Sequence, residues 1–334
     1  MKILLATIVA PMIAFAAPNL ALAEKASLGH VFPAGDAADT ASKQFAELIK
    51  ERTNGEVEIT VFPNGQLGSD ESLGRDLTRG AIEFAFLNVG SLTGLDPLLD
   101  IHYLPYIVTT NDEADRIFYN PDGILQRTLN ESLEAHRIVP IGYFELGFRA
   151  VTNSKHPVNT VEELQGLKIR VPGSAAIQSF FEAAGSQVVT MPFTNLFVAL
   201  QQGTVDGQDN GASLTYNARL FEAQRYMTLT NHTYAMGAIA VSKRFWDRLS
   251  PETQGIIKET ATEVAADQIA ASRTATEDFV TKIEAGGVAV VRLDGAAMTS
   301  FVDAGHKGWD ALIPVYGEER ISDLRGELEA IKSQ

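Results

Sequence analysis

Residues 166–211 read GLKIRVPGSAAIQSFFEAAGSQVVTMPFTNLFVALQQGTVDGQDNG, and this stretch decides the predicted fold. It contains three short segments typical of strands, separated by two segments with helical spacing of apolar residues. The predicted strands are residues 168–171, residues 187–190 and a segment that begins at Val205. Alternating strands and helices predict a parallel sheet with crossover helices, whose ligands gather at the ends of the strands.

Specific residues mark where both helices of this stretch begin and end. Ser174 is placed to cap the first helix, and Gly185 supplies its C-terminal stop. Thr194 is expected to cap the second helix, which Gly203 ends. Three residues suited to a ligand lie at or just beyond a strand end: Arg170, Phe193 and Asn210.

The N-terminal half of the chain repeats the alternation of strand and helix. Strands are expected at residues 26–32, 57–62 and 82–87. The first helix between them is expected to begin at Asp39 or Thr40. This order predicts another parallel sheet. Later apolar segments predict further strands at residues 138–143, 148–152, 236–242 and 288–293.

A long helix is predicted near the C-terminus. Ser250-Pro251-Glu252 combines a capping side chain, a first-turn proline and an acid at the positive end of the helix dipole. Helix-forming residues continue to Glu284, before Gly286-Gly287. A helix of about 35 residues is roughly 50 Å long, which exceeds one domain of this size. We therefore expect it to bridge two domains that move about a hinge.

The N-terminus predicts export from the cytoplasm. Lys2 precedes an apolar run, residues 3–17, and Ala21-Leu22-Ala23 forms a small-x-small cleavage site. This pattern is typical of a secretory signal peptide over residues 1–23. The absence of a twin arginine favours the general secretion route. An uncleaved membrane anchor is the alternative, although the apolar run is short for a membrane span.

Composition narrows the range of partners. The chain has 42 Asp and Glu against 27 Lys and Arg, whereas nucleic-acid binding needs clustered positive charge. We therefore expect no nucleic acid and no anionic membrane surface as partners. An acidic protein binds an anion only where specific arginines reverse the local field. The chain has no cysteine, so its stability must come from burial of its core.

Catalytic motifs are not found in the sequence. It lacks a GxSxG elbow, an HExxH pair, a GxGxxG turn and a phosphate-binding loop. The six histidines are scattered, and no two lie at metal-ligand spacing. Adjacent acidic residues are typical of solvated helix starts. We therefore predict no catalytic residue, no metal ligand and no cofactor, and leave open whether a metal ion assists ligand binding.

Two arginines in the second half carry the functional hypothesis. Arg170 lies within a predicted strand, where a charged side chain is costly unless it is paired. One interpretation is a structural pair with Asp206 or Asp209. The other is a planar fork that holds a ligand carboxylate through two parallel hydrogen bonds. Arg149 raises the same question at the start of another strand.

Several segments resemble the periplasmic solute-binding proteins of TRAP transporters, the C4-dicarboxylate-type family. They are FRAVTNS (residues 148–154), LQGLKIRVP (164–172), MPF (191–193), LQQGTVDGQDN (200–210), FPNGQLG (62–68) and TNH (230–232). The resemblance covers essentially the whole mature chain. The chain departs from the family pattern at Asp209, where Glu is common, and at Gly211, where Pro is common. Both lie beside Asn210 and obscure which ligand is bound.

The resemblance implies an α/β fold of the clamshell type with two lobes. Each lobe would be a mixed, mostly parallel sheet flanked by helices, and a long helix would bridge them. We expect lobe I to comprise residues 24–147 and 236–276, and lobe II to comprise residues 148–235 and 277–334.

The resemblance also assigns ligand-binding roles. Arg170 would make the main bidentate contact to a carboxylate, and Arg149 would support it. Asn210 would hydrogen-bond the ligand, and Phe193 would form an apolar wall. Four lobe I residues match positions facing the cleft: Asn88, Asp70, His30 and Phe32. Two alternatives stay open, since Asp70 could cap the following helix and Phe32 could belong to the core.

The implied function is capture of a small organic carboxylate and its delivery to TRAP transporter membrane subunits. The ligand would be a sugar acid, a hydroxy acid or a dicarboxylate, and the sequence does not choose among them. A monomer is expected. One alternative is an exported enzyme that acts on a sugar acid in the same cleft. Another is a sensor that docks on a receptor.

Overall fold

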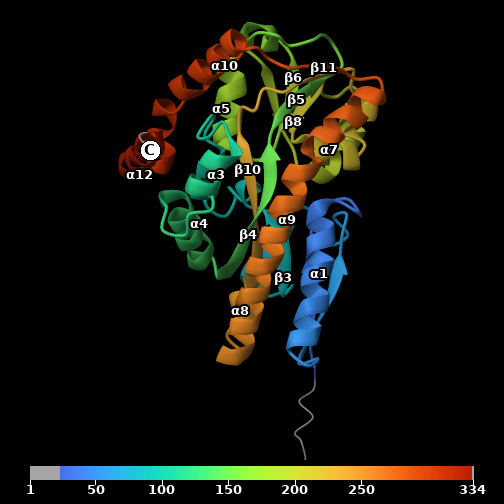
Figure 1. Ribbon diagram of the computed structural model, residues 1–334, viewed down its shortest axis with the longest axis vertical. Helices are drawn as coiled ribbons and strands as arrows, with labels where there is room; N and C mark the ends of the chain where they lie inside the picture. The colour runs from blue at the N-terminus through green and yellow to red at the C-terminus, as the bar shows by residue number, and fades with distance from the viewer. Residues whose placement is uncertain (1–22, 333–334) are drawn as a thin grey trace, which may run out of the picture.

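The computed structural model of this chain describes residues 23–332. The predicted signal peptide therefore lies almost entirely outside the described residues. Within them the chain folds into a mixed α/β structure with two sheets, each flanked by helices (Figure 1). No helix of this part is both long enough and apolar enough to cross a membrane.

The first sheet has the strand order β2-β1-β3-β10-β4. Its strands are β1 (Glu24–Gly29), β2 (Val57–Phe62), β3 (Phe84–Asn88), β4 (Ile138–Phe148) and β10 (Tyr234–Ser242). Strand β1 pairs in parallel with β2 and β3, joined by helices α1 (Ala37–Arg52) and α2 (Asp70–Arg79). This confirms the predicted alternation. Strand β10 runs antiparallel to β3 and β4, which makes the sheet mixed.

The second sheet has the strand order β11-β9-β5-β8-β6-β7. Its strands are β5 (Ala150–Asn153), β6 (Lys168–Val171), β7 (Gln187–Thr190), β8 (Gly207–Asn210), β9 (Tyr226–Thr228) and β11 (Ala289–Val291). Strand β6 lies between β7 and β8 and is parallel to both, as the opening stretch predicts. The crossovers are α5 (Ala175–Ala183) and, after the 3₁₀ turn η4 (Phe193–Asn195), α6 (Leu196–Gln201).

Of the two helix caps predicted within residues 166–211, one is confirmed. The Ser174 hydroxyl accepts the N–H of Ile177 at 3.1 Å, so Ser174 caps α5. The predicted cap at Thr194 is wrong, because α6 begins after Asn195 and has no side-chain cap. Thr194 already lies inside η4, whereas a capping residue needs extended backbone before the first turn.

Three connections join the two sheets. Strand β4 continues through Arg149 into β5, and β9 leads through residues 229–233 into β10. The third is the 35-residue helix α9 (Pro251–Ala285), which the Ser250 hydroxyl caps as predicted. Helix α9 packs on α1 and β4 of one lobe and on α7 (Ala212–Asn217) and β11 of the other (Figure 1). The predicted bridging helix is confirmed.

The remaining elements are helices and 3₁₀ turns, some of them on the surface and some buried against the core or the cavity. They are η1 (Val89–Ser91), η2 (Pro97–Tyr103), α3 (Asn111–Ile117), α4 (Ile124–Ala135), η3 (Val161–Leu164), η5 (Leu220–Ala223), α8 (Lys243–Trp246), α10 (Gly295–Lys307), η6 (Asp310–Leu312), α11 (Ile313–Tyr316) and α12 (Glu318–Lys332). Helix α10 contacts η3 and α5, whereas α12 contacts α3 and α4. The C-terminal helices therefore touch elements on both sides of the predicted lobe boundary.

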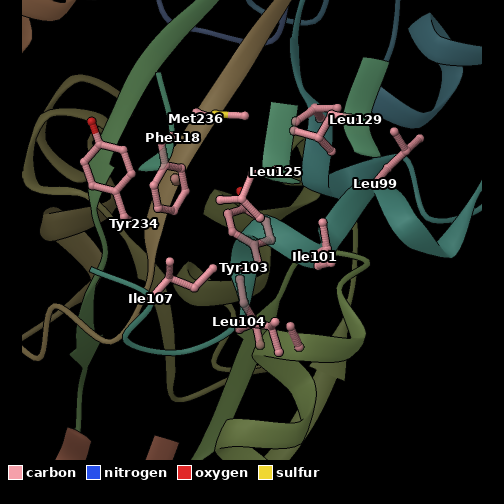
Figure 2. Close-up of a cluster of buried hydrophobic side chains, with 14 of the residues drawn as sticks. Leu99, Ile101, Tyr103, Leu104, Ile107, Phe118, Leu125, Leu129, Tyr234 and Met236 are labelled. Carbon is pink, nitrogen blue, oxygen red and sulfur yellow. The ribbon is translucent and has the colours of Figure 1, made fainter. Parts of the chain in front are cut away.

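A buried apolar cluster joins the lobes behind the cleft. Figure 2 shows side chains from η2, α4 and β10 that meet in it, including Tyr103, Leu125 and Met236. The same cluster extends to Ile169 and Val171 of β6. Because the chain has no disulfide, this apolar burial is its main source of stability.

Candidate ligand-binding site

A narrow cavity opens between the two sheets. Its lining contains most of the residues predicted for the site: Arg170, Arg149, Asn210, Phe193, Asn88, Asp70 and Phe32. Gly211, noted above as a departure from the family pattern, also lines it. Residues that the sequence did not single out complete the lining: Val31, Asp36, Ala37, Ser91, Glu145, Leu146, Ser213, Leu214, Gln268 and Ser272. The structure thus brings together side chains from both lobes.

Arg170 of β6 is buried with no carboxylate partner. Its Nε and Nη2 donate to the carbonyl of Met191 at 3.0 and 2.7 Å, which fixes the guanidinium plane. Only 2 % of the residue is exposed. No Asp or Glu of the described chain lies within 4.0 Å of its nitrogens. Burial lowers the pKa of Arg170 to about 10, so the group is still a cation at neutral pH.

The structural interpretation of Arg170 required a pair with Asp206 or Asp209, and neither pair forms. Asp206 instead binds Lys155 at 3.1 Å, and Asp209 binds Arg149. A buried cation without a partner is costly. An anion in the cavity would remove that cost.

Arg149 is held between β4 and β5 by Asp209. Its Nε lies 2.7 Å from Asp209 Oδ2, and its Nη2 donates to the Asp209 carbonyl. The guanidinium also lies 5.3 Å from the centre of the Tyr103 ring. Burial alone would lower the pKa of Arg149, but the Asp209 carboxylate overrides it and raises the pKa. Arg149 thus borders the cavity as a cation that is already neutralised.

Asn210 ends β8 with its amide orientation fixed. Its Nδ2 donates to Gln208 Oε1, and Gln208 Nε2 donates to Thr152 Oγ1 at 2.9 Å. This leaves Asn210 Oδ1 without a hydrogen bond to any described residue. Phe193 of η4 lies partly exposed at the edge of the same wall. Both residues line the cavity, and their contact with a ligand stays a prediction.

Asp70 and Asn88 come from neighbouring elements of lobe I. Asp70 Oδ1 accepts the backbone N–H of Asn88 at 3.0 Å, and Asn88 Oδ1 accepts the Tyr103 hydroxyl at 2.6 Å. The interpretation of Asp70 as the helix cap is wrong, since the Ser69 hydroxyl caps α2. Burial raises the pKa of Asp70 to about 7, so its proton is labile near neutrality.

Phe32 and His30 follow β1 and have different positions. Phe32 is both core and lining, because it packs edge-on against Phe144 at 5.7 Å and borders the cavity. His30 does not reach the cavity, contrary to its predicted place facing the cleft. Its Nε2 lies 3.1 Å from Ser42 Oγ and 3.5 Å from Asp39 Oδ1. Burial lowers the pKa of His30 to about 4. Its neutral ring packs against the ring of Phe32, with the ring centres 5.7 Å apart.

Glu145 is a lining residue that the sequence analysis missed. It lies on β4 with 3 % of its area exposed, and burial raises its pKa. The predicted strand ended at Tyr143, so Glu145 fell beyond it. Strand β4 continues to Phe148, and a lone acid inside this apolar strand was the available signal.

Asp36 was also missed, and it connects the lobes across the mouth of the cavity. It caps α1, which begins at Ala37 rather than at the predicted Asp39 or Thr40. Its Oδ2 accepts hydrogen bonds from Ser213 Oγ at 3.2 Å and from Asn217 Nδ2 at 2.9 Å, both on α7. The lobes are therefore held together at the mouth by the Asp36 carboxyl group, although burial raises its pKa.

A metal centre has no support in residues 23–332. They contain no group of three or more His, Cys, Asp or Glu side chains placed to hold an ion. The lining presents a fixed cation on one wall, and carboxylate and amide groups on the other.

Comparison with known proteins identifies the family. Residues 28–313 match the family described as "Bacterial extracellular solute-binding protein, family 7". The chain belongs to this family. It is 29% identical over 286 residues to the 2,3-diketo-L-gulonate-binding periplasmic protein YiaO of Escherichia coli, and the match covers 86% of each chain. The family is one of binding proteins that act outside the cytoplasm.

Solved structures of family members share the fold. The sugar acid binding protein DctPAm from Advenella mimigardefordensis, in complex with galactonate, superposes with a TM-score of 0.87 at 29% identity. That match covers 93% of this chain and 98% of the other. A TRAP periplasmic solute-binding protein from Sulfurospirillum deleyianum with bound succinate gives a TM-score of 0.84 at 26% identity, covering 91% and 99%. The two-lobed clamshell is thus the family fold.

Proposed function

We propose that the protein captures a small organic carboxylate in the cavity and delivers it to the membrane subunits of a TRAP-type transporter. The buried Arg170 guanidinium is the observation that carries this proposal. It is fixed by Met191, borders the cavity and has no carboxylate partner in the described chain. A ligand carboxylate supplies the missing charge through charge-assisted hydrogen bonds.

The ligands of similar proteins agree with an acid. Galactonate is bound in the Advenella protein, succinate in the Sulfurospirillum protein, and 2,3-diketo-L-gulonate is named for the Escherichia coli relative. All three carry a carboxylate. Similar proteins are also described as TRAP components, which supports a secondary transporter as the partner.

Capture begins when the ligand carboxylate reaches Arg170 between separated lobes. Arg149 keeps its bond to Asp209, so its charge stays balanced beside the ligand. Closure brings Asp36 onto Ser213 and Asn217 and excludes water from the cavity. Water exclusion lowers the local dielectric constant, which strengthens the bonds to the carboxylate. Reopening at the membrane subunits releases the ligand unchanged.

A thermal-shift screen of the wild-type protein tests this proposal. The panel holds organic acids and the neutral sugars and polyols of matching size. An acid at 100 times its dissociation constant adds about 2.7 kcal/mol to stability, whereas the neutral compounds leave the melting temperature unchanged. Stabilisation by neutral sugars alone overturns the proposal. Mass spectrometry of the released compound distinguishes a carrier, which returns the same acid, from an enzyme.

A further inference from the structure

The wall formed by the first sheet carries a carboxylate whose arrangement is not explained by the fold. We infer that Glu145 determines ligand specificity: it accepts a hydrogen bond from a ligand hydroxyl, so that the cavity selects hydroxylated monocarboxylates over dicarboxylates. This inference rests on the proposed function, because it assumes that Arg170 binds one carboxylate.

Glu145 is held in place through only one of its carboxylate oxygens. The Tyr234 hydroxyl donates to Oε2 at 2.6 Å, and Arg273 Nε donates to the same oxygen at 2.7 Å. The Gln268 amide fixes the backbone, accepting from the N–H of Glu145 at 2.9 Å and donating to its carbonyl at 2.8 Å. Oε1 has no hydrogen bond to any residue of the described chain, and the side chain borders the cavity. It is a preorganised acceptor.

The ion pair with Arg273 does not by itself explain why a buried carboxylate stands at position 145. Arg273 also donates to both oxygens of Asp115, at 3.0 and 2.7 Å. Its charge is therefore balanced without Glu145, and the three groups together keep a negative charge. Glu145 is the one of them that borders the cavity.

The charges of the lining accommodate one ligand carboxylate. Its basic residues are Arg170 and Arg149, and Arg149 is already paired with Asp209. A second carboxylate on the ligand would enter a cavity whose other ionisable groups are acidic: Asp36, Asp70 and Glu145. In their ionised forms these groups repel a second carboxylate, so a dianion is bound less well than a monoanion of the same size.

Hydroxyl groups suit the same wall. A hydroxyl donates to a carboxylate oxygen in a charge-assisted hydrogen bond and accepts from a neighbouring amide. Besides Glu145 Oε1, Asp70 Oδ2 has no hydrogen bond within the described chain. Asn88, whose Oδ1 is occupied by Tyr103, has its amide N–H groups available as donors. A polyol chain attached to the carboxylate meets alternating acceptors and donors.

Isothermal titration calorimetry of the full mature protein tests this inference with four probes. Galactonate and erythronate carry hydroxyls and one carboxylate, succinate carries two carboxylates, and hexanoate carries one carboxylate and no hydroxyl. We expect the wild type to bind galactonate or erythronate, whichever of the two binds more tightly, at least about tenfold more tightly than succinate or hexanoate. A tenfold difference in affinity is about what one charged hydrogen bond contributes. Glu145→Gln should lower that affinity about tenfold or more and leave hexanoate within about twofold.

Glu131→Gln is the matched control, since Glu131 is exposed on α4 outside the cavity lining and its loss removes the same charge. The inference is overturned if the wild type binds succinate as tightly as the hydroxylated acids. It is equally overturned if Glu145→Gln keeps the wild-type ratio of affinities. The ratio of the wild-type affinities for the hydroxylated acids and for succinate is measured without any variant. It therefore tests the inference even if Glu145→Gln folds poorly. If none of the four acids binds, the proposed function itself fails and this inference falls with it.

Discussion

The two walls of the cavity differ in charge. The wall from the second sheet presents Arg170 and Arg149, both fixed by bonds within that lobe or at the hinge. The wall from the first sheet presents Asp70 and Glu145. Under the proposed function, the cation with no carboxylate partner would recognise the carboxylate that all the ligands share, whereas acceptors on the other wall would distinguish among them. Affinity and specificity would then be assigned to different walls of the cavity.

The largest expected effect is a loss of unfolding free energy when the wall that carries the two arginines loses its compensating carboxylate. Asp209→Asn removes the carboxylate that neutralises Arg149, leaving a buried cation uncompensated. Breaking a buried pair in this way costs about 3–5 kcal/mol of unfolding free energy. Urea denaturation measures the loss. Asp122→Asn, at an exposed position, is the control and should change stability by less than about 0.5 kcal/mol. Equal stabilities would show that Arg149 does not depend on Asp209.

On the acidic wall, the stability of the ligand-free protein should depend on pH through Asp70. Its pKa is raised to about 7 in the folded state, so the folded protein binds this proton more tightly than the unfolded chain. The contribution of Asp70 to stability is therefore largest at low pH and falls as pH rises from about 4 to about 7, by on the order of 1 kcal/mol per pH unit.

Asp70→Asn removes this titration, because the amide keeps an oxygen for the Asn88 N–H. The stability difference between variant and wild type should move in favour of the variant between pH 5 and pH 7.5, by about 2 kcal/mol. Thermal denaturation at several pH values measures it. Taking the difference cancels the other buried acids, Asp36, Asp100 and Glu145. A difference independent of pH would contradict the raised pKa.

Arg170→Ala separates recognition from folding. The loss of the fork should lower affinity for an acid about a hundredfold or more, since each charged hydrogen bond contributes about 1.5–3 kcal/mol. Folding should be retained, because the variant also removes a buried cation without a partner. Calorimetry with galactonate measures the affinity. Lys168→Ala, exposed on the same strand, should bind as the wild type does. Unchanged affinity in Arg170→Ala would contradict the assignment of carboxylate binding to the wall of the second sheet.

The smallest effect concerns the contact that closes the walls. Asp36→Ala removes two hydrogen bonds to α7 at the mouth, so the closed state loses stability relative to the open one. We expect a loss of affinity of about tenfold, similar for every monocarboxylate, because their contacts to the cavity do not change. The dissociation rate, measured by stopped flow, should rise correspondingly. A change confined to one ligand would instead place Asp36 among the ligand contacts.

Local signals in the sequence predicted much of the fold. Strands β6 and β7 and the start of α9 lie where the apolar runs and the Ser-Pro-Glu cap indicated. The buried environment of Arg170 was also predictable, since a charge inside an apolar strand must be buried or paired. These features depend on residues close in sequence, and the physics that sets them is short-range.

Features that depend on distant elements were not predictable. Glu145 lines the cavity because Tyr234 and Arg273, far along the chain, hold it there. His30 turns away because Ser42 and the α1 helix provide its partners. The contact of Asp36 with α7 exists only when the lobes meet. In each case the sequence shows a polar residue, but its direction is set by tertiary packing.

The single long helix has a mechanical consequence for release of the ligand. Because α9 is attached to both lobes, the lobes separate only if the helix flexes or slides, which limits the amplitude of opening. Thr274 and Thr276 bond the carbonyls four residues earlier, a pattern that bends helices. Both lie within a turn or so of Ser272, which lines the cavity. Thr260, Thr262 and Thr281 make the same bond elsewhere in α9, so the points at which the helix can bend are spread along it, and one of them lies beside the cavity.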